Sequence, residues 1–326
     1  MQRRHTLKIF AAGPLAMATS AWAQAPYPQR PVRLVVGFSA GGSTDVAARK
    51  LAQRLSSSLG QQVVVENKLG AAGSIASAEV ARSAADGYTL QMATSGTHTI
   101  NPTTMAKIGY DPVADFIPIG LICTQPLAIC VNPSVPARSL PELFKLIKDS
   151  PGKYAYASSG NGGIAHVAAE LLRDQAGLNM VHIPYKGGAP ATQDVIAGHV
   201  PILFDTFSAD LPHHRAGRLR ILAVTGETRS RAAPELATVK EHGLPNYVAV
   251  TGTWLVAPAR TPAAVIDRLS TAVQSAMADI SFVKELEDLG NDVVTNTTPA
   301  LALTFMRAEI ARWSPIIKKA GIQAES

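Results

Sequence analysis

Short apolar runs alternate with amphipathic stretches along most of the chain. Val32–Val36 is the first such run, and Ala47, Leu51 and Leu55 follow it at the four-residue spacing of one helix face. Further strands are predicted at residues 63–65, 89–93, 154–157, 181–183, 202–204, 221–224 and 248–256. Helices are predicted at residues 75–84, 140–148, 165–175 and 189–197. This alternation predicts an α/β fold whose parallel-type sheets carry helices on both faces.

Two long apolar runs, Phe116–Val131 and residues 247–256, interrupt this alternation. No internal repeat or flexible linker divides the chain into consecutive domains. We therefore expect the two runs to cross between two lobes. Lobe 1 would contain residues 24–125 and 250–326, and lobe 2 would contain residues 126–249. Ligands of such folds bind at the carboxyl ends of the strands.

Four glycine-rich turns fall at predicted strand ends, at residues 37–42, 95–98, 158–163 and 186–188. A turn from a strand into a helix gathers backbone N–H groups and the positive end of the helix at one place. Glycine lets the backbone approach a ligand where a Cβ atom would block it. Four such turns in one chain predict a cleft for a carboxylate or a phosphate.

Several polar side chains lie beside these turns. His98 and His166 each follow a glycine turn and are candidate hydrogen-bond donors to a ligand, with a structural role as the alternative. Asp45 is expected to cap the first helix or also to order a water in the cleft. Tyr185 offers a ring and a phenol, although it is equally suited to packing, and Asp205 closes a strand on the ligand side. No metal site is expected, because neither histidine has a carboxylate partner at a fitting spacing.

Two enzyme interpretations compete with a binding role. Gly37-Phe38-Ser39-Ala40-Gly41 matches G-x-S-x-G, which would make Ser39 the nucleophile of a secreted serine hydrolase. However, this turn follows the first strand, and no downstream histidine stands out as the base. A dinucleotide site would need the spacing G-x-G-x-x-G, whereas the chain has G-x-x-x-G-G, so no cofactor is expected.

The N-terminus has the features of an export signal. Arg3, Arg4 and Lys8 precede a short apolar stretch, and Ala21-Trp22-Ala23 supplies small residues for cleavage. The predicted signal peptide is residues 1–23, and both the Sec and the twin-arginine routes are compatible with it. Removing its three basic residues lowers the net charge from +6 to +3, too little to favour nucleic acid. A periplasmic protein is expected.

Cys123 and Cys130 lie in one apolar run. If the run is a single strand, seven residues separate the sulfurs by about 23 Å, far beyond disulfide distance. A turn at Gln125 and Pro126 would instead bring them together. We favour two buried free thiols.

The motifs in these segments resemble the extracytoplasmic solute receptors of tripartite tricarboxylate transporters, the Bug family. The resemblance spans nearly the whole mature chain. It rests on Pro31-x-Arg33-x-Val35-Val36, Gly41-Gly42-x-x-Asp45, Val65-Glu66-Asn67-Lys68-x-Gly70-Ala71-x-Gly73, Asp86-Gly87-Tyr88-Thr89-Leu90, Ile183-Pro184-Tyr185-Lys186-Gly187-Gly188-Ala189-Pro190-Ala191 and Ala257-Pro258-x-x-Thr261-Pro262.

The resemblance implies a two-lobed periplasmic binding protein of type II topology that closes on its ligand like a flytrap, without catalysis or cofactor. Backbone amides and waters would hold a small carboxylate, and Tyr185 and Asp205 would complete the pocket, with Asp205 at the far end of the ligand. The implied ligand loops comprise Phe38, Ser39, Ala40, Gly41, Gly42, Ser95, Gly96, His98, Ser159, Gly160 and Asn161. A dicarboxylate, a tricarboxylate, an acidic amino acid and an aromatic acid all remain open. The expected partners are the membrane components of the transporter, and the receptor itself is expected to be a monomer.

Overall fold

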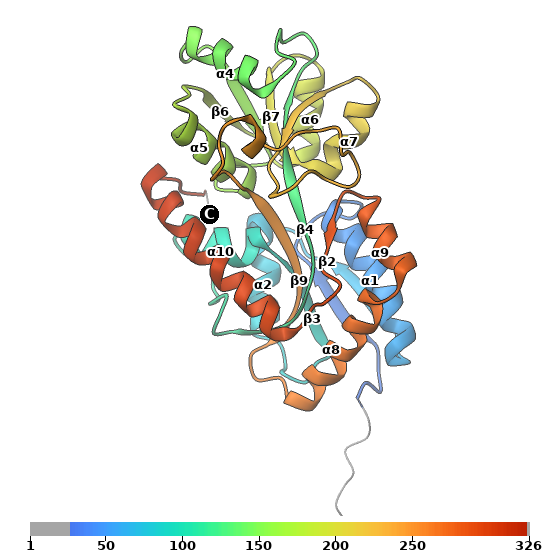
Figure 1. Cartoon of the computed structure of the whole chain (residues 1–326). Helices are drawn as coiled ribbons and strands as arrows, with labels where there is room; N and C mark the ends of the chain where they lie inside the picture. The colour runs from blue at the N-terminus through green and yellow to red at the C-terminus, as the bar shows by residue number, and fades with distance from the viewer. Residues whose placement is uncertain (1–26, 325–326) are drawn as a thin grey trace, which may run out of the picture.

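The computed structural model describes residues 27–324 and shows two lobes joined by long strands (Figure 1). The predicted signal peptide, residues 1–23, lies outside the described residues. Within residues 27–324, no helix combines the length and the apolar character that a bilayer crossing requires.

Lobe 1 is built on three parallel strands. β1 (Val32–Val36) pairs with β2 (Val63–Asn67) on one side and with β3 (Thr89–Thr94) on the other. The helices and short helical turns of this lobe are α1 (Ser43–Leu59), η1 (Ala71–Gly73), α2 (Ser74–Ala81), η2 (Gly96–Ile100), α3 (Asn101–Thr104), α8 (Ala263–Met277) and α9 (Ile280–Glu287). The predicted stripe of α1 is confirmed, because Ala47, Leu51 and Leu55 are buried against α8 and the sheet.

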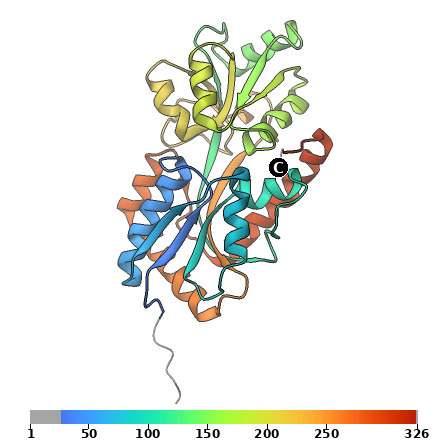
Figure 2. The same cartoon turned by 180° about the vertical axis from the view of Figure 1, so that it is seen from behind.

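Lobe 2 repeats this arrangement with β5 (Ala155–Ser158) between β6 (Val181–Pro184) and β7 (Ile202–Thr206), all parallel. β8 (Arg220–Val224) joins the same sheet through an antiparallel pairing with β4. The helical elements here are α4 (Leu140–Asp149), α5 (Ile164–Ala176), α6 (Gly188–Ile196), α7 (Phe207–Arg215) and η3 (Lys240–His242). Figure 2 shows helices on both faces of each sheet, as the alternating pattern predicts.

Two antiparallel strands connect the lobes. β4 (Phe116–Val131) pairs with β9 (Val250–Pro258) from Phe116 to Pro126, and with β7 from Leu127 onward. One strand therefore belongs to both sheets, which gives two-lobed character without a linker. β10 (Asp292–Val293) also pairs with β4. Each sheet is thus mixed, with a parallel centre and antiparallel crossing strands.

The crossing strand also decides the cysteine question. Cys123 and Cys130 are both free and buried in β4, which runs through Gln125 and Pro126 without a turn. Burial raises the pKa of the Cys123 thiol to about 12, and burial beside Asp210 also raises the pKa of Cys130. Both thiols are therefore protonated at neutral pH.

The last helix, α10 (Pro299–Ala320), lies along both lobes (Figure 1). Thr298 caps its start by accepting a hydrogen bond from the Leu301 N–H, and Pro299 occupies the first helical position.

Candidate functional site

The four glycine turns follow β1, β3, β5 and β6 at their carboxyl ends, where the lobes face each other (Figure 2). Two turns come from each lobe. Parallel strands bring their carboxyl ends to the same edge of a sheet, so the topology positions all four turns between the lobes.

The turn after β1 is held by Asp45. Its carboxylate accepts hydrogen bonds from the Gly41 N–H at 2.8 Å, from Arg49 Nε at 2.9 Å and from Asn67 Nδ2 at 2.8 Å. Asn67 Nδ2 also donates to the Phe38 carbonyl at 2.9 Å. Burial favours the neutral acid, but the bonds from Arg49, Gly41 and Asn67 outweigh it and lower the pKa of Asp45. The carboxylate is therefore ionised and fully engaged.

Asp45 does not have the capping position that the sequence suggested. The N-cap of α1 is Gly42, whose position carries no side-chain cap, and Asp45 lies in the first turn of the helix. The prediction failed because a glycine occupies the cap, and the acidic side chain reaches back to Gly41 from inside the helix instead.

His98 has the structural role that the sequence left open as the alternative to a ligand donor. The π-helical turn η2 directs its ring into the lobe 1 core, where it contacts Phe116 at 4.6 Å and Tyr110 and Trp254 at 5.9 Å between ring centroids. The side chain is fully buried, and burial lowers its pKa to about 3. The neutral ring is therefore a core group in this arrangement, with Nδ1 2.9 Å from Thr97 Oγ1.

Ser95, the residue before η2, connects its turn to a crossing strand. Its Oγ accepts a hydrogen bond from the Gly252 N–H of β9 at 2.7 Å, and the side chain is buried. Gly96 alone within residues 95–98 retains appreciable exposure. This turn therefore offers backbone, rather than side chains, to the space between the lobes.

Two stacked histidines hold the turn after β5. His166 Nδ1 accepts a hydrogen bond from the Gly162 N–H at 3.0 Å, and its ring stacks on His182 at 3.8 Å. His182 Nε2 lies 2.7 Å from Ser158 Oγ. Burial is the main cause that lowers the pKa of both rings, and that of His182 falls to about 3, with His166 and Arg173 adding to the effect. His182 is not among the site residues predicted from the sequence. Its position as a polar residue inside the short apolar strand β6 is the feature that could have identified it.

Asp205 lies near the end of β7, and its carboxylate contacts the fourth turn from there. Its Oδ1 accepts a hydrogen bond from the Thr206 N–H at 2.8 Å, and a Cβ atom on Gly188 would lie only 2.1 Å from its Oδ2. The carboxylate thus rests on the first residue of α6, where a helix start favours negative charge. Burial raises the pKa of Asp205 to about 6.

Asp210 stands behind Asp205 and is fully buried. Its carboxyl oxygens lie 3.4 Å from Cys130 Sγ and 3.4 Å from Thr192 Oγ1. Burial, together with the charge of Asp205, raises the pKa of Asp210 well above its usual value. This group was also missed, because its burial depends on the packing of α7 against β4.

Tyr185 is half-buried, and its hydroxyl donates to Asp194 of α6. Burial and this carboxylate raise the pKa of Tyr185 to about 12, so the phenol stays protonated. Asp194 also lies 2.7 Å from His199 Nδ1.

The predicted site residues fall into two groups. Some remain at least partly exposed on the facing ends of the lobes: Phe38, Ser39, Ala40, Gly41, Gly42, Gly96, Ser159, Gly160, Asn161 and Tyr185. The others are buried and support the turns: Asp45, Ser95, His98, His166 and Asp205.

A cationic anion site, a metal site and a serine nucleophile would each need particular side chains at the four turns. Lys186 is the sole Lys or Arg of the four turns, and its side chain is exposed. Among residues 27–324, no group of three His, Cys, Asp or Glu side chains is placed to hold a metal ion. In the same range, Ser39 forms no side-chain hydrogen bond to a histidine, as a hydrolase nucleophile would require.

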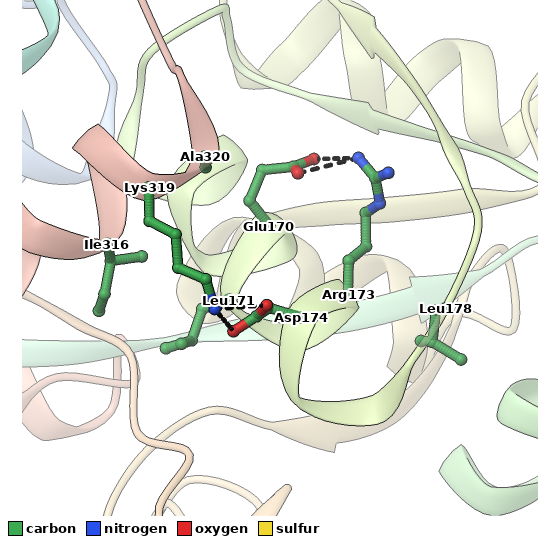
Figure 3. Close-up of a pocket in the computed structure, with 8 residues that line it drawn as sticks. All are labelled: Glu170, Leu171, Arg173, Asp174, Leu178, Ile316, Lys319 and Ala320. Carbon is green, nitrogen blue, oxygen red and sulfur yellow. Dashed lines mark hydrogen bonds and ion pairs between the residues drawn. The ribbon is translucent and has the colours of Figure 1, made fainter.

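A cavity of about 300 Å³ lies elsewhere, between the later turns of α5 and the end of α10 (Figure 3). Its charged lining side chains are paired, Arg173 with Glu170 at 2.7 Å and Lys319 with Asp174 at 2.8 Å. None of the predicted site residues lines it. The cavity therefore lies where the end of α10 packs against lobe 2.

The comparisons with known proteins agree with this architecture. The family model described as "Tripartite tricarboxylate transporter family receptor" matches residues 47–322. BugT of Bordetella pertussis is 37% identical over 298 residues, which cover 90% of each chain. A protein of R. palustris solved with adipate has a TM-score of 0.86 at 35% identity, covering 91% of this chain and 99% of that one.

MatC from Rhodopseudomonas palustris, solved with bound malate, has a TM-score of 0.81 at 29% identity and covers 89% of this chain and 100% of its own. These matches extend over both lobes and the crossing strands. The matched family is one of receptors, so the hydrolase interpretation of Ser39 is set aside. The chain belongs to the receptors of the tripartite tricarboxylate transporter family, the periplasmic solute-binding proteins that include the Bug proteins.

Proposed function

We propose that the chain binds a small carboxylate between its lobes and delivers it to the membrane components of a tripartite tricarboxylate transporter. One observation carries this proposal. α1 and α5 begin at glycines on the facing ends of the two lobes, and neither helix start has a side-chain cap. The first N–H groups of each helix thus remain available to an anion from outside.

Backbone donors are sufficient for useful affinity. A negative charge at a helix start gains about 0.3–1 kcal/mol when exposed, and up to about 2 kcal/mol when partly buried. Two helix starts with several charge-assisted hydrogen bonds can reach about −8 kcal/mol, which corresponds to micromolar binding. The relatives solved with adipate and malate support a carboxylate as the ligand.

The fourth turn plays a different part in this proposal. Asp205 already fills the start of α6, so a ligand carboxylate is expected at the turns that begin α1 and α5. Asp205 then faces the far end of the ligand. Dicarboxylates, tricarboxylates, acidic amino acids and aromatic acids all remain candidates, and those that present a hydrogen-bond donor to Asp205 suit its ionised form best.

We further propose the lobe boundaries given above, residues 24–125 with 250–326 and residues 126–249, and a monomeric receptor. The change of β4 from β9 to β7 between Pro126 and Leu127 supports the first boundary. Export to the periplasm through the signal peptide, residues 1–23, completes the proposal.

A ligand screen tests this function. The mature protein is unfolded and refolded to remove any carried ligand, and an acid library is then screened by thermal shift and by calorimetry. We expect at least one small carboxylate to raise the Tm and to bind with micromolar affinity, and Lys186→Ala to weaken it less than fivefold. No response to any acid, or complete loss of binding in Lys186→Ala, would contradict the backbone-anion account.

A further inference from the structure

α10 belongs by its start to lobe 1 and by its end to lobe 2. Ala302 and Met306 pack in the lobe 1 cluster that contains Trp254. Trp313 and Ile317 instead belong to the cluster that holds lobe 2 core residues such as Leu172, together with Ile100 of lobe 1. One rigid helix thus contacts both bodies that a flytrap motion would have to move.

The four residues after α10 continue this double contact. Gly321 ends the helix with φ of +64°, which turns the chain back toward the lobes. Ile322 is buried in the same cluster as Trp313 and Ile317. Ala324 then donates its N–H to the carbonyl of Thr104, at the end of α3 in lobe 1, at 2.9 Å.

This C-terminal segment, Gly321–Ala324, also contacts the lobe 2 turn proposed to bind ligand. Asn161 Nδ2 donates to the Gln323 carbonyl at 2.9 Å. A Cβ atom on Gly162 would lie 2.7 Å from Cβ of Ala324, so the segment packs on this turn at a distance that only glycine allows. Figure 1 shows the chain that follows α10 running beside α5, at the level where the lobes meet.

The contact binds the side-chain amide of Asn161, which can change its hydrogen-bond partner more easily than the backbone donors of that turn. The Gly162 N–H is bonded to His166, and the Gly160 N–H lies 3.3 Å from Ser158 Oγ. Asn161, by contrast, is exposed and has a side chain that can rotate toward a ligand. A ligand oxygen and the Gln323 carbonyl are alternative acceptors for its amide.

We propose that Gly321–Ala324 is a strap that ties the lobe 2 binding turn to lobe 1 and competes with the ligand for Asn161. The part about competition rests on the proposed function, whereas the part about the tie between the lobes does not. The strap stabilises the ligand-free arrangement, and binding releases it.

A truncation that ends at Ile322 removes Gln323 and Ala324, which make the strap's hydrogen bonds to Asn161 and Thr104, and keeps the buried side chain of Ile322. Spin labels on Ser57→Cys in lobe 1 and Lys148→Cys in lobe 2, both exposed sites, report the distance between lobes without any ligand. The native thiols are buried and stay unlabelled. We expect the truncated chain to show a broader distance distribution than the full chain. An unchanged distribution would overturn the tie between the lobes.

Binding measurements test the competition with adipate, malate and any acid found in the screen. Loss of one hydrogen-bonded contact that opposes binding should raise the affinity about threefold to tenfold in the truncated chain. The same truncation in an Asn161→Ala background should leave the affinity of that background unchanged. A lower affinity on truncation would make the segment part of the binding site and would overturn the competition.

Two point variants are matched controls for the truncation. Gln323→Ala keeps the backbone carbonyl that Asn161 contacts, so it should behave like the native chain. Ala324→Pro removes the N–H that bonds Thr104 and should broaden the distance distribution as the truncation does. If Gln323→Ala changes the lobe distances and the affinity as the truncation does, the side chain of Gln323 causes these effects, and the proposed role of its backbone carbonyl is wrong. If no acid binds, the distance measurement still decides the tie between the lobes, and the proposed function fails separately.

Discussion

The turns that start α1 and α5 have the same position in the two lobes, but a charged side chain supports the first and neutral side chains support the second. In lobe 1, the turn at residues 37–42 is held by the ionised carboxylate of Asp45, which is paired with Arg49 and accepts hydrogen bonds from the Gly41 N–H and from Asn67. In lobe 2, the turn at residues 158–163 is held by two imidazoles that burial keeps neutral. Both use glycine where the backbone meets the solvent.

This difference gives the lobes different responses to pH. The Asp45 network is complete at any pH above the ordinary titration of a carboxyl group. The lobe 2 turn depends on His166 as an acceptor, which a proton on Nδ1 would remove. We infer that lobe 1 presents a constant binding surface, while lobe 2 responds to protonation near its two histidines and Asp205.

The largest expected effect concerns the backbone of the lobe 1 turn. Gly41 has φ of +81°, and a Cβ atom there would point into open space. Gly41→Val places a β-branched side chain where the proposed ligand approaches, so affinity should fall at least 100-fold, or about 2.7 kcal/mol. Calorimetry with the acid from the screen measures it.

Gly60→Val is the matched control for Gly41→Val. Gly60 ends α1 with φ of +71°, and a Cβ atom there would also meet no neighbour within 4 Å. It shares the backbone strain of Gly41 but lies at the opposite end of the helix. Equal losses of binding in both variants would show that strain, rather than blocked approach, is the cause.

The second prediction removes the charged support of lobe 1. Asp45→Ala leaves the Gly41 N–H, Asn67 and Arg49 without their shared acceptor, and should lower the free energy of unfolding by about 1–3 kcal/mol. Arg49 is half exposed, so Arg49→Ala should cost only about 0.5–1 kcal/mol. Urea unfolding at pH 7.5 measures both. A larger loss in Arg49→Ala than in Asp45→Ala would contradict the central position of the carboxylate.

The third prediction concerns Asp205 in lobe 2. Its pKa rises from 3.8 to about 6 on folding, so the folded chain holds this proton more tightly than the unfolded chain. Its contribution to stability is therefore present at low pH and is lost as pH rises through about 6. The Asp205→Asn variant cannot ionise at this position. The free energy of unfolding of the variant, minus that of the native chain, should therefore be about 1–2 kcal/mol higher at pH 8 than at pH 4.

Urea unfolding at both pH values decides this prediction. Asp267→Asn is the control, because it removes the same charge at an exposed position of α8 in lobe 1. If both variants change alike, general charge reduction explains the result. The amide introduced by Asp205→Asn should also alter which acids bind, because it adds a hydrogen-bond donor where the carboxylate could only accept.

Local patterns were enough to predict most of the fold. The strand Phe116–Val131 was predicted to its last residue, because a largely apolar run of this length without a break suits a strand that is buried from end to end. The stripe in α1 likewise depends on neighbours in sequence. The mixed direction of the sheets was not visible, because strand direction depends on which distant strands pair.

The positions of the turns were also predictable, but the orientations of their side chains were not. His98 lies inside a π-helical turn, which directs its ring toward Phe116, and nothing in the local sequence announces a turn of this kind. The roles of His182 and Asp210 depend on contacts between distant segments: β6 pairs with β5, and α7 packs against β4. The sequence around each residue does not reveal these contacts. Local sequence determines where glycine bends the chain, whereas tertiary packing decides which polar groups the bend buries.

The smallest expected effect has the opposite sign to that of Asp205. Burial, with His166 and Arg173 nearby, lowers the pKa of His182 from 6.5 to about 3, so the folded chain resists this proton while the unfolded chain accepts it. Stability from neutral His182 is present above pH 6.5 and is lost as pH falls below it. The glutamine introduced by His182→Gln can still bond Ser158 but cannot titrate, so the stability gap between the native and variant chains should narrow by about 1 kcal/mol from pH 7.5 to pH 5. His242→Gln in η3 is the control. If the difference in free energy of unfolding between the native chain and His182→Gln is the same at both pH values, the lobe 2 turn tolerates a proton on His182 and does not differ from lobe 1 in its response to pH.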